Sequence, residues 1–331
     1  MLLQKTMDQI VQRLKAIDDI LVTTHTNPDG DALGSLVALG SALKALGKRT
    51  LWYNASPIPA VYRFIPSIQR VTSNLDAVGG FKAVVVLDCG NIQRIGPLAD
   101  RVRQIPLIIN IDHHTTNSHF GHLNYVDTEV CASTEIVYHL LNRLGVTIDK
   151  AMATAIYTGI LTDTGSFRFS NTNEPAFAIC HEMVNRGVDP SQVAQFVYGR
   201  FSMGRIKLLN LALDTIEITP DGRVSLMSLT QEMLKKTGTQ LEDADGLINY
   251  ARRIEDVRMA VLIQETINGS DPQQSAKKTY HVSLRSDGTV DVSAIAAAFG
   301  GGGHIAAAGF NAQGCLTTIK KRLLELAAAT A

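Results

Sequence analysis

Three short runs of apolar and β-branched residues, each followed by a histidine or an acid, constrain the fold of this chain most. The runs cover residues 20–24, 83–87 and 107–111. The residues that follow them are His25, Asp88 and Asp112. Short unbroken runs of this kind suit strands that are buried on both faces of a parallel sheet. Helical patterns alternate with them, at residues 32–46, 133–144 and 151–162. The alternation predicts an α/β domain with a doubly wound, mostly parallel sheet.

A different pattern follows residue 213. Short strand patterns separated by turn signals cover residues 216–218, 224–229, 259–264 and 280–285, and a helical pattern covers 292–299. This succession predicts a second, smaller α+β domain. We therefore expect a first domain at residues 1–200, a connecting helix at 201–213 and a second domain at 214–331.

The composition excludes several classes of protein. The 331 residues carry a formal net charge of zero, so no overall field attracts a long polyanion. We expect no long-duplex nucleic acid and no membrane as a partner, because no apolar run is long enough to span a bilayer. The four cysteines have no CxxC spacing, and the N-terminus lacks a signal-peptide core. These features predict a reducing, cytoplasmic location.

The segment HTNPDGD, residues 25–31, lies between the first strand pattern and the first long helical pattern. Pro28 and Gly30 favour a tight bend, which lets His25, Asp29 and Asp31 converge. The alternative is a plain turn in which Asp31 caps the helix. This segment alone does not decide between the two interpretations.

The other strand ends favour the ligand interpretation. In doubly wound sheets a ligand lies beyond the carboxyl ends of the strands. Here three predicted strands end at a histidine or an acid, so these side chains are expected to meet there. The chemically relevant residues outside the first loop are Asp88, Asp112, His113, His114 and Asp163. Carboxylates and imidazoles without thiolates favour Mn²⁺ or Mg²⁺ over structural zinc. The set is too large for one ion, so it predicts two ions that share a carboxylate.

These motifs together resemble those of the DHH phosphoesterase superfamily. The resemblance rests on HTNPDGD, the strand end at Asp88, the sequence Asp112-His113-His114, and Asp163. The sequence GGGGH, which ends at His304, is similar to the signature of the DHH-associated C-terminal domain. Length and domain plan resemble the group of bifunctional oligoribonucleases and pAp phosphatases. That resemblance implies hydrolysis of very short RNAs from the 5′ end and removal of the 3′-phosphate of 3′-phosphoadenosine 5′-phosphate (pAp).

The resemblance also implies a role for each residue. It gives the first ion His25 and Asp29, and the second ion Asp31, His113 and Asp163. Asp88 would bridge the two ions. Two residues remain for catalysis beside Asp88: His114 would assist the phosphate or the leaving group, and Asp112 would orient the histidines.

The glycine run of the second domain is either a flexible linker or a phosphate-binding segment. An apolar helical pattern precedes it and an apolar stretch follows it, which argues against a linker. Glycines allow backbone N–H groups to approach an anion closely. The resemblance implies that substrate is bound by Arg285, Gly301, Gly302, Gly303 and His304.

Several alternatives remain open. A phosphodiesterase for cyclic or linear dinucleotides, such as cyclic di-AMP or pApA, differs little at the metals. A manganese inorganic pyrophosphatase would carry a basic SRKKQ-type stretch, which this chain lacks. A RecJ-like exonuclease would require a larger chain with a more basic channel, and a nucleotide sensor would have weakened ligands. The expected partners are short RNAs and small phosphorylated nucleotides; a homodimer is left open.

Overall fold

The computed structural model describes residues 2–74, 76, 80–199, 201–266 and 278–330. The chain divides into two compact units, Met1–Arg200 and Phe201–Ala331. Helix α8 (Met203–Leu213) belongs to the second unit. Within the described residues, no helix has the length and apolar character needed to cross a membrane.

The first unit is built on a six-stranded sheet in the order β3-β2-β1-β4-β5-β6, and every strand pairing in it is parallel. The strands are β1 (Asp19–Thr24), β2 (Arg49–Tyr53), β3 (Val71–Thr72), β4 (Ala83–Leu87), β5 (Leu107–Asp112) and β6 (Leu123–Val126). This confirms the predicted doubly wound sheet. The edge strands β3 and β6 were not predicted, because they are short and only half-buried and so lack a continuous apolar run.

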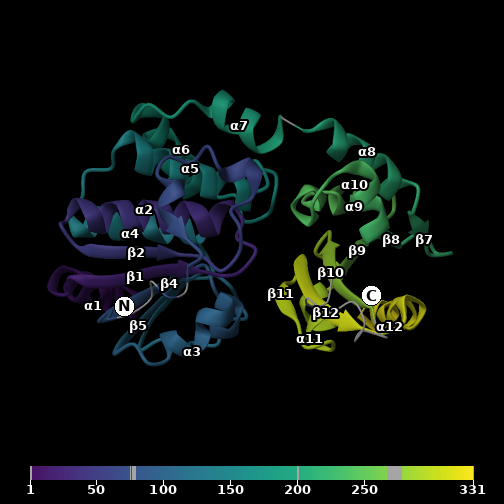
Figure 1. Ribbon diagram of the computed structural model, residues 1–331, viewed down its shortest axis with the longest axis horizontal. Helices are drawn as coiled ribbons and strands as arrows, with labels where there is room; N and C mark the ends of the chain where they lie inside the picture. Colours follow the sequence, from purple (N-terminus) through teal and green to yellow (C-terminus); the bar gives the residue numbers. More distant parts are fainter. Residues whose placement is uncertain (1, 75, 77–79, 200, 267–277, 331) are drawn as a thin grey trace. The chain divides into compact units, whose positions relative to one another are not determined.

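Helices cover both faces of this sheet. They are α1 (Leu2–Ala16), α2 (Gly30–Ala45), α3 (Ala99–Val102), α4 (Ser133–Leu144), α5 (Lys150–Asp163), α6 (Glu174–Asn185) and α7 (Pro190–Tyr198), with short 3₁₀ helices η1 (Ala60–Tyr62), η2 (Ile68–Arg70) and η4 (Ile92–Leu98). Helices α2, α4 and α5 lie on one face and α3 on the other (Figure 1). Alternate residues of β4 explain this arrangement, since Val85 packs with the first group and Val84 with the second.

Helices α2 and α5 approach each other closely at two glycines. A Cβ on Gly34 would lie 2.5 Å from the carbonyl oxygen of Ala155, and the backbone of Gly159 is the next neighbour. A side chain at Gly34 would therefore push the helices apart. The contact holds the first turn of α2, with Asp31, in register with the last turn of α5, with Asp163.

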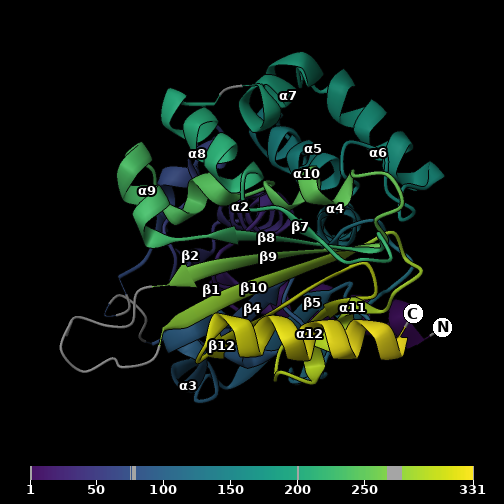
Figure 2. The ribbon, with the colours of Figure 1, turned by 90° about the vertical axis from the view of Figure 1, so that its right-hand side faces the viewer.

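The second unit has a mixed sheet in the order β11-β12-β10-β9-β8-β7, in which only the β8–β9 pairing is parallel. The strands are β7 (Glu217–Ile218), β8 (Val224–Leu229), β9 (Met259–Thr266), β10 (Thr279–Ser286), β11 (Gly302–His304) and β12 (Ala307–Gln313). The helices are α8, α9 (Gln231–Thr237), α10 (Ile248–Arg252), α11 (Val292–Ala297) and α12 (Leu316–Thr330), with the 3₁₀ helix η5 (Leu241–Ala244). Helices α8 to α10 and helices α11 and α12 pack on opposite faces (Figure 2).

Most predicted elements of the second unit are present, but α9, α10, β11 and β12 were not predicted. The glycine run contributes to β11, an edge strand that forms a hairpin with β12. Glycine is unfavourable in strands, so the glycine run did not predict a strand at these residues.

Candidate metal centre

The loop between β1 and α2 brings three predicted ligands to the carboxyl edge of the first sheet. The His25 ring donates from Nδ1 to the carbonyl oxygen of Thr26 at 2.8 Å, which leaves Nε2 as a ligand atom. Asp29 caps helix α2, since its Oδ1 accepts from the N–H of Ala32 at 3.0 Å. The helix cap is thus Asp29, and the alternative in which Asp31 serves as the cap is wrong.

Asp31 is buried in the first turn of α2 and is held by the N-terminus of α4. Its Oδ2 accepts from the N–H of Ser133 at 2.7 Å, and its Oδ1 accepts from the N–H of Thr134 at 2.8 Å and from the Thr134 hydroxyl. A helix N-terminus favours a carboxylate through its unsatisfied N–H groups. Sequence reasoning missed this partner, although Ser-Thr at a predicted helix start was a usable signal.

Asp88, at the end of β4, lies between two groups of ligands. Its Oδ2 is 3.5 Å from Nε2 of His25, and its Oδ1 is 3.6 Å from Nε2 of His113. The hydroxyl of Ser133 donates to Oδ1 at 3.1 Å. The backbone of Asp88 is left-handed, with φ of 50°, which is uncommon for a residue other than glycine and is concentrated at functional sites.

A second group of ligand atoms surrounds His113. Its Nε2 lies 3.8 Å from Asp31 Oδ2 and 3.8 Å from Asp163 Oδ2. Two ligands that are each about 2.0–2.2 Å from one ion lie roughly 3–4 Å apart, so these separations fit a shared cation. The metal-type groups found within this unit are His25/Asp29/Asp88, Asp31/His113/Asp163 and Asp88/Asp112/His114. The all-oxygen-and-imidazole donor set suits a divalent cation.

The buried acids of the centre differ in pKa. Burial, together with the charges of Asp88 and Asp163, raises the pKa of Asp31 well above its ordinary value. Burial acts in the same direction on Asp88, but His25, His114 and His113 overcome it and hold the pKa of Asp88 far below the ordinary value. Carboxylates that crowd in this way repel one another until a cation is bound.

Asp112 and His114 form a separate pair. The ring of His114 donates from Nδ1 to Asp112 Oδ1 at 2.7 Å, and Asp112 is fully buried. Burial opposes protonation of His114, but Asp112 outweighs it and raises the pKa of His114 to about 9. Nδ1 is therefore occupied, and Nε2 is the ring atom that can act on a substrate.

Two asparagines near the centre were not found by sequence reasoning. Asn171 donates from Nδ2 to Asp163 Oδ2 at 3.2 Å and to the carbonyl oxygen of Cys131 at 2.8 Å. Asn117 donates from Nδ2 to Asp112 Oδ2 at 2.5 Å. Both asparagines follow their acids by several residues in loops, where no periodic pattern marks them.

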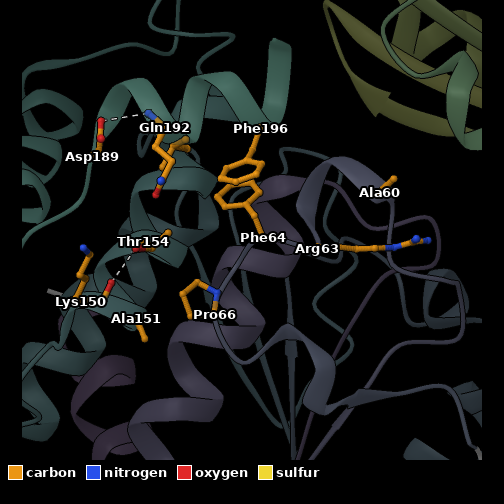
Figure 3. Close-up of a pocket in the computed structure, with 11 residues that line it drawn as sticks. Ala60, Arg63, Phe64, Pro66, Lys150, Ala151, Thr154, Asp189, Gln192 and Phe196 are labelled. Atoms are coloured by element: carbon orange, nitrogen blue, oxygen red, sulfur yellow. Dashed lines mark hydrogen bonds between the residues drawn. The ribbon is translucent and has the colours of Figure 1, made fainter. Parts of the chain in front are cut away.

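A surface pocket of about 720 Å³ lies elsewhere in the first unit (Figure 3). The stacked rings of Phe64 and Phe196, with centroids 4.7 Å apart, form part of its wall, and Arg63 and Lys150 are among its polar lining residues. None of its lining residues belongs to the three ligand groups. The pocket is therefore distinct from the candidate metal centre.

The predicted substrate-binding residues meet on the sheet of the second unit. Arg285 on β10 and His304 on β11 are both paired with Ala307 on the strand between them. Directly opposed residues of neighbouring strands point to the same face, so the two side chains flank Ala307, with their Cα atoms about 10 Å apart. The N–H of Gly301 donates to the carbonyl oxygen of Ala296 at 2.9 Å, so it is already used. Gly302 and Gly303 lie within β11.

Comparisons with known proteins agree with this architecture. The model of the "DHH family, N-terminal domain" matches residues 19–160, and that of the "DHHA1 domain" matches residues 227–329. The bifunctional oligoribonuclease and PAP phosphatase NrnA of Thermus thermophilus is 33% identical over 324 residues, covering 96% of this chain and 92% of that protein. This chain belongs to the DHH family. The resemblance inferred from its motifs is thereby confirmed.

Two further relatives extend the comparison of this DHH-family chain. The bifunctional oligoribonuclease and PAP phosphatase NrnA of Bacillus subtilis is 27% identical and covers 91% of both chains. The crystal structure of an exopolyphosphatase-related protein from Bacteroides fragilis superposes with a TM-score of 0.86 at 26% identity, covering 99% of this chain and 98% of that one. The likeness therefore extends through both units.

Proposed function

We propose that this DHH-family phosphoesterase hydrolyses short oligoribonucleotides from the 5′ end and removes the 3′-phosphate of pAp. The observation that carries the proposal is the pair of ligand groups that meet at Asp88, one on each carboxylate oxygen. The names of the relatives from Thermus thermophilus and Bacillus subtilis support the choice of substrates. The substrates are small and anionic, which suits a chain without net charge.

The ligand groups favour two ions in this proposal, with Mn²⁺ preferred and Mg²⁺ as the alternative. His25 and Asp29 would hold one ion, Asp31, His113 and Asp163 the other, and Asp88 both. Bound ions of this kind activate a water molecule and stabilise the leaving oxygen in phosphoryl displacement. The N-terminus of α4 keeps Asp31 fixed for this task, since Ser133 and Thr134 donate to both of its oxygens.

His114 is the proposed acid for the leaving oxygen. Its Nδ1–H is held by Asp112, so Nε2 is the ring atom that this proposal assigns to the leaving oxygen. To act as the acid, the ring also carries a proton on Nε2, which it gives to the leaving oxygen, and a bound cation would favour this release by lowering the pKa of the ring. Proton transfer from a positioned histidine typically contributes ~100- to 10,000-fold in rate.

Arg285 and His304 are the proposed anchors for a second phosphate of the substrate. Their placement on either side of Ala307 leaves a small residue between two cationic or hydrogen-bonding side chains. Gly302 and Gly303 add an edge strand without side chains, where an anion can approach the backbone. Gly301 contributes through its small size, because its N–H already has an acceptor.

One substrate panel tests the proposal. Purified protein with Mn²⁺ is incubated with pAp, pApA, a five-nucleotide RNA and cyclic di-AMP, and products are separated by chromatography. The proposal predicts turnover of pAp and the short RNA, with mononucleotides released from the 5′ end. Turnover of cyclic di-AMP alone would move the assignment to a cyclic dinucleotide phosphodiesterase, and binding without turnover would indicate a sensor.

A further inference from the structure

Asp112 has two carboxylate oxygens, and a different side chain holds each of them. Oδ1 accepts from Nδ1 of His114 at 2.7 Å. Oδ2 accepts from Nδ2 of Asn117 at 2.5 Å. Because Asp112 is fully buried, water has little access to replace either donor. The direction of the carboxylate plane, and with it the direction of the His114 ring, therefore depends on Asn117.

The amide of Asn117 is itself fixed from both ends. Its Nδ2 also donates to Oδ1 of the fully buried Asn110 at 2.8 Å, and Asn110 donates to the carbonyl oxygen of Val86 at 3.2 Å. Its Oδ1 accepts from the backbone N–H of His119 at 2.7 Å. These bonds leave one orientation for the amide, with the NH₂ group toward Asp112.

The backbone around Asn117 closes over the end of β4. The N–H of Asn117 donates to the carbonyl oxygen of His114 at 3.1 Å, and the N–H of Ser118 donates to that of Gly90 at 2.8 Å. A Cβ on Gly90 would lie 3.6 Å from Asp112 Oδ2 and 3.7 Å from the Cα of Asn117, so the loop is in ordinary van der Waals range of this glycine. The loop is thus hydrogen-bonded to the segment that follows β4 and contains Asp88.

We propose that Asn117 is a positioning residue, which acts through Asp112 to fix the tautomer and the ring orientation of His114. The inference rests on the proposed function, because it assigns His114 the leaving-group oxygen. In a hydrogen-bonded network of this kind, the orientation of each side chain depends on the next one. Substitution of an outer residue typically lowers activity by roughly 10- to 100-fold. In the described structure, the side-chain hydrogen bonds of Asn117 reach Asp112 and Asn110 and none of the residues assigned to hold the ions.

The test compares two substitutions of the same chemistry. Asn117→Asp keeps the acceptor for the N–H of His119 but replaces the donor toward Asp112 by a second oxygen. The matched control is Asn124→Asp, near the start of β6, where the side-chain amide bonds only to the backbone of Gly121 in the described structure. Both variants are measured in the full chain for metal content, thermal midpoint, kcat and KM.

We expect Asn117→Asp to keep its metal content and to lower kcat roughly 10- to 100-fold with little change in KM. Asn124→Asp should lose no more than a few degrees of thermal midpoint and should keep wild-type kinetics. Asn117→Gln, which retains an amide donor, should recover part of the activity. Equal kcat values for Asn117→Asp and wild type, or equal losses in the two aspartate variants, would overturn the proposal.

A second measurement separates this inference from the proposed function. The ¹⁵N chemical shifts of the His114 ring, recorded at a pH above the pKa of the ring, where it carries a single proton, report its tautomer without any substrate. We expect the Nδ1–H form in the wild type and the Asn124→Asp variant, and an altered or averaged form in Asn117→Asp. If the wild-type enzyme fails on the whole substrate panel, the proposed function fails, while the ring spectra still decide the role of Asn117. Unchanged ring spectra in Asn117→Asp would refute it.

Discussion

The metal centre of the first unit and the Arg285/His304 surface of the second unit are built in opposite ways. The centre is made from strand ends and helix ends, and most of its side chains are buried. The surface is made from side chains on the faces of β10 and β11, which are half-buried. Buried and mutually supported groups suit bond breaking, while groups on a strand face suit binding. We therefore expect the two regions to control different kinetic constants.

The most severe test of this difference is removal of the metal. Dialysis against a chelator should abolish turnover of every substrate, and added Mn²⁺ should restore it. The thermal midpoint should also fall, because the crowded acids Asp31, Asp88 and Asp163 then repel one another. Calorimetry and product assays on the same sample check both effects. Full turnover by metal-stripped protein would show that the first region does not use bound ions for bond breaking.

Loss of the shared carboxylate should come next. Asp88→Ala should lower kcat by about 1,000-fold. This factor corresponds to about 4 kcal/mol of lost transition-state stabilisation, which the bound ions would otherwise supply. Metal content measured by mass spectrometry should fall in parallel. A variant with two bound ions and near-normal activity would contradict the bridging assignment.

Changing the binding surface should have a smaller and different effect. Arg285→Ala should lower kcat/KM by roughly 10- to 100-fold, the range for loss of a charged hydrogen bond of about 1.5–3 kcal/mol. Its metal content should stay unchanged, because Arg285 lies outside the metal centre's unit. The exposed Arg253, changed to alanine, serves as the matched control. Loss of metal in Arg285→Ala, or wild-type kinetics on the whole panel, would make the anchor assignment wrong.

Substrate length gives a milder test. Without net charge the protein has no long-range attraction for a polyanion, so kcat/KM should decline from two-nucleotide to thirty-nucleotide RNA. The measurement is a length series at constant salt and constant concentration of 5′ ends. Equal rates at both lengths would indicate a binding channel that the two regions do not provide.

The smallest effect is expected beside the shared carboxylate. Cys89 is fully buried, and burial raises the pKa of its thiol to about 12, so it stays protonated and unreactive. Cys89→Ala should keep near-normal activity and lose about 1 kcal/mol of unfolding free energy. Denaturant titration and the pAp assay check this. A loss of activity as large as that of Asp88→Ala would reveal a role for the thiol.

The sequence was more informative for one region than for the other, for a physical reason. Asp88 and Asp112 follow runs of buried residues, and parallel strands place their carboxyl ends at one edge, so convergence followed from the pattern. The strands β11 and β12 are rich in glycine and alanine and contain no β-branched residue, so their pairing depends on tertiary contacts. The position of Ala307 between Arg285 and His304 therefore required the structure.

The supporting groups of the metal centre were also beyond the sequence. Ser133 and Thr134 reach Asp31 from a helix about a hundred residues later in the chain, and Asn117 reaches Asp112 from an irregular loop. Such contacts depend on how helices and loops are placed on the sheet. A pattern of apolar residues specifies burial but carries no information on these directions.

The close approach of α2 and α5 at Gly34 has a consequence for how the protein is made. The ligand groups begin at His25 and are complete only at Asp163, and α5 docks on α2 across this glycine contact. As the chain is synthesised, the early strands can pair while the acids at their ends still lack a full set of partners. A complete set of ligands therefore requires α5 to be docked on α2, so a divalent cation would find all of its ligands only after this helix pair has formed.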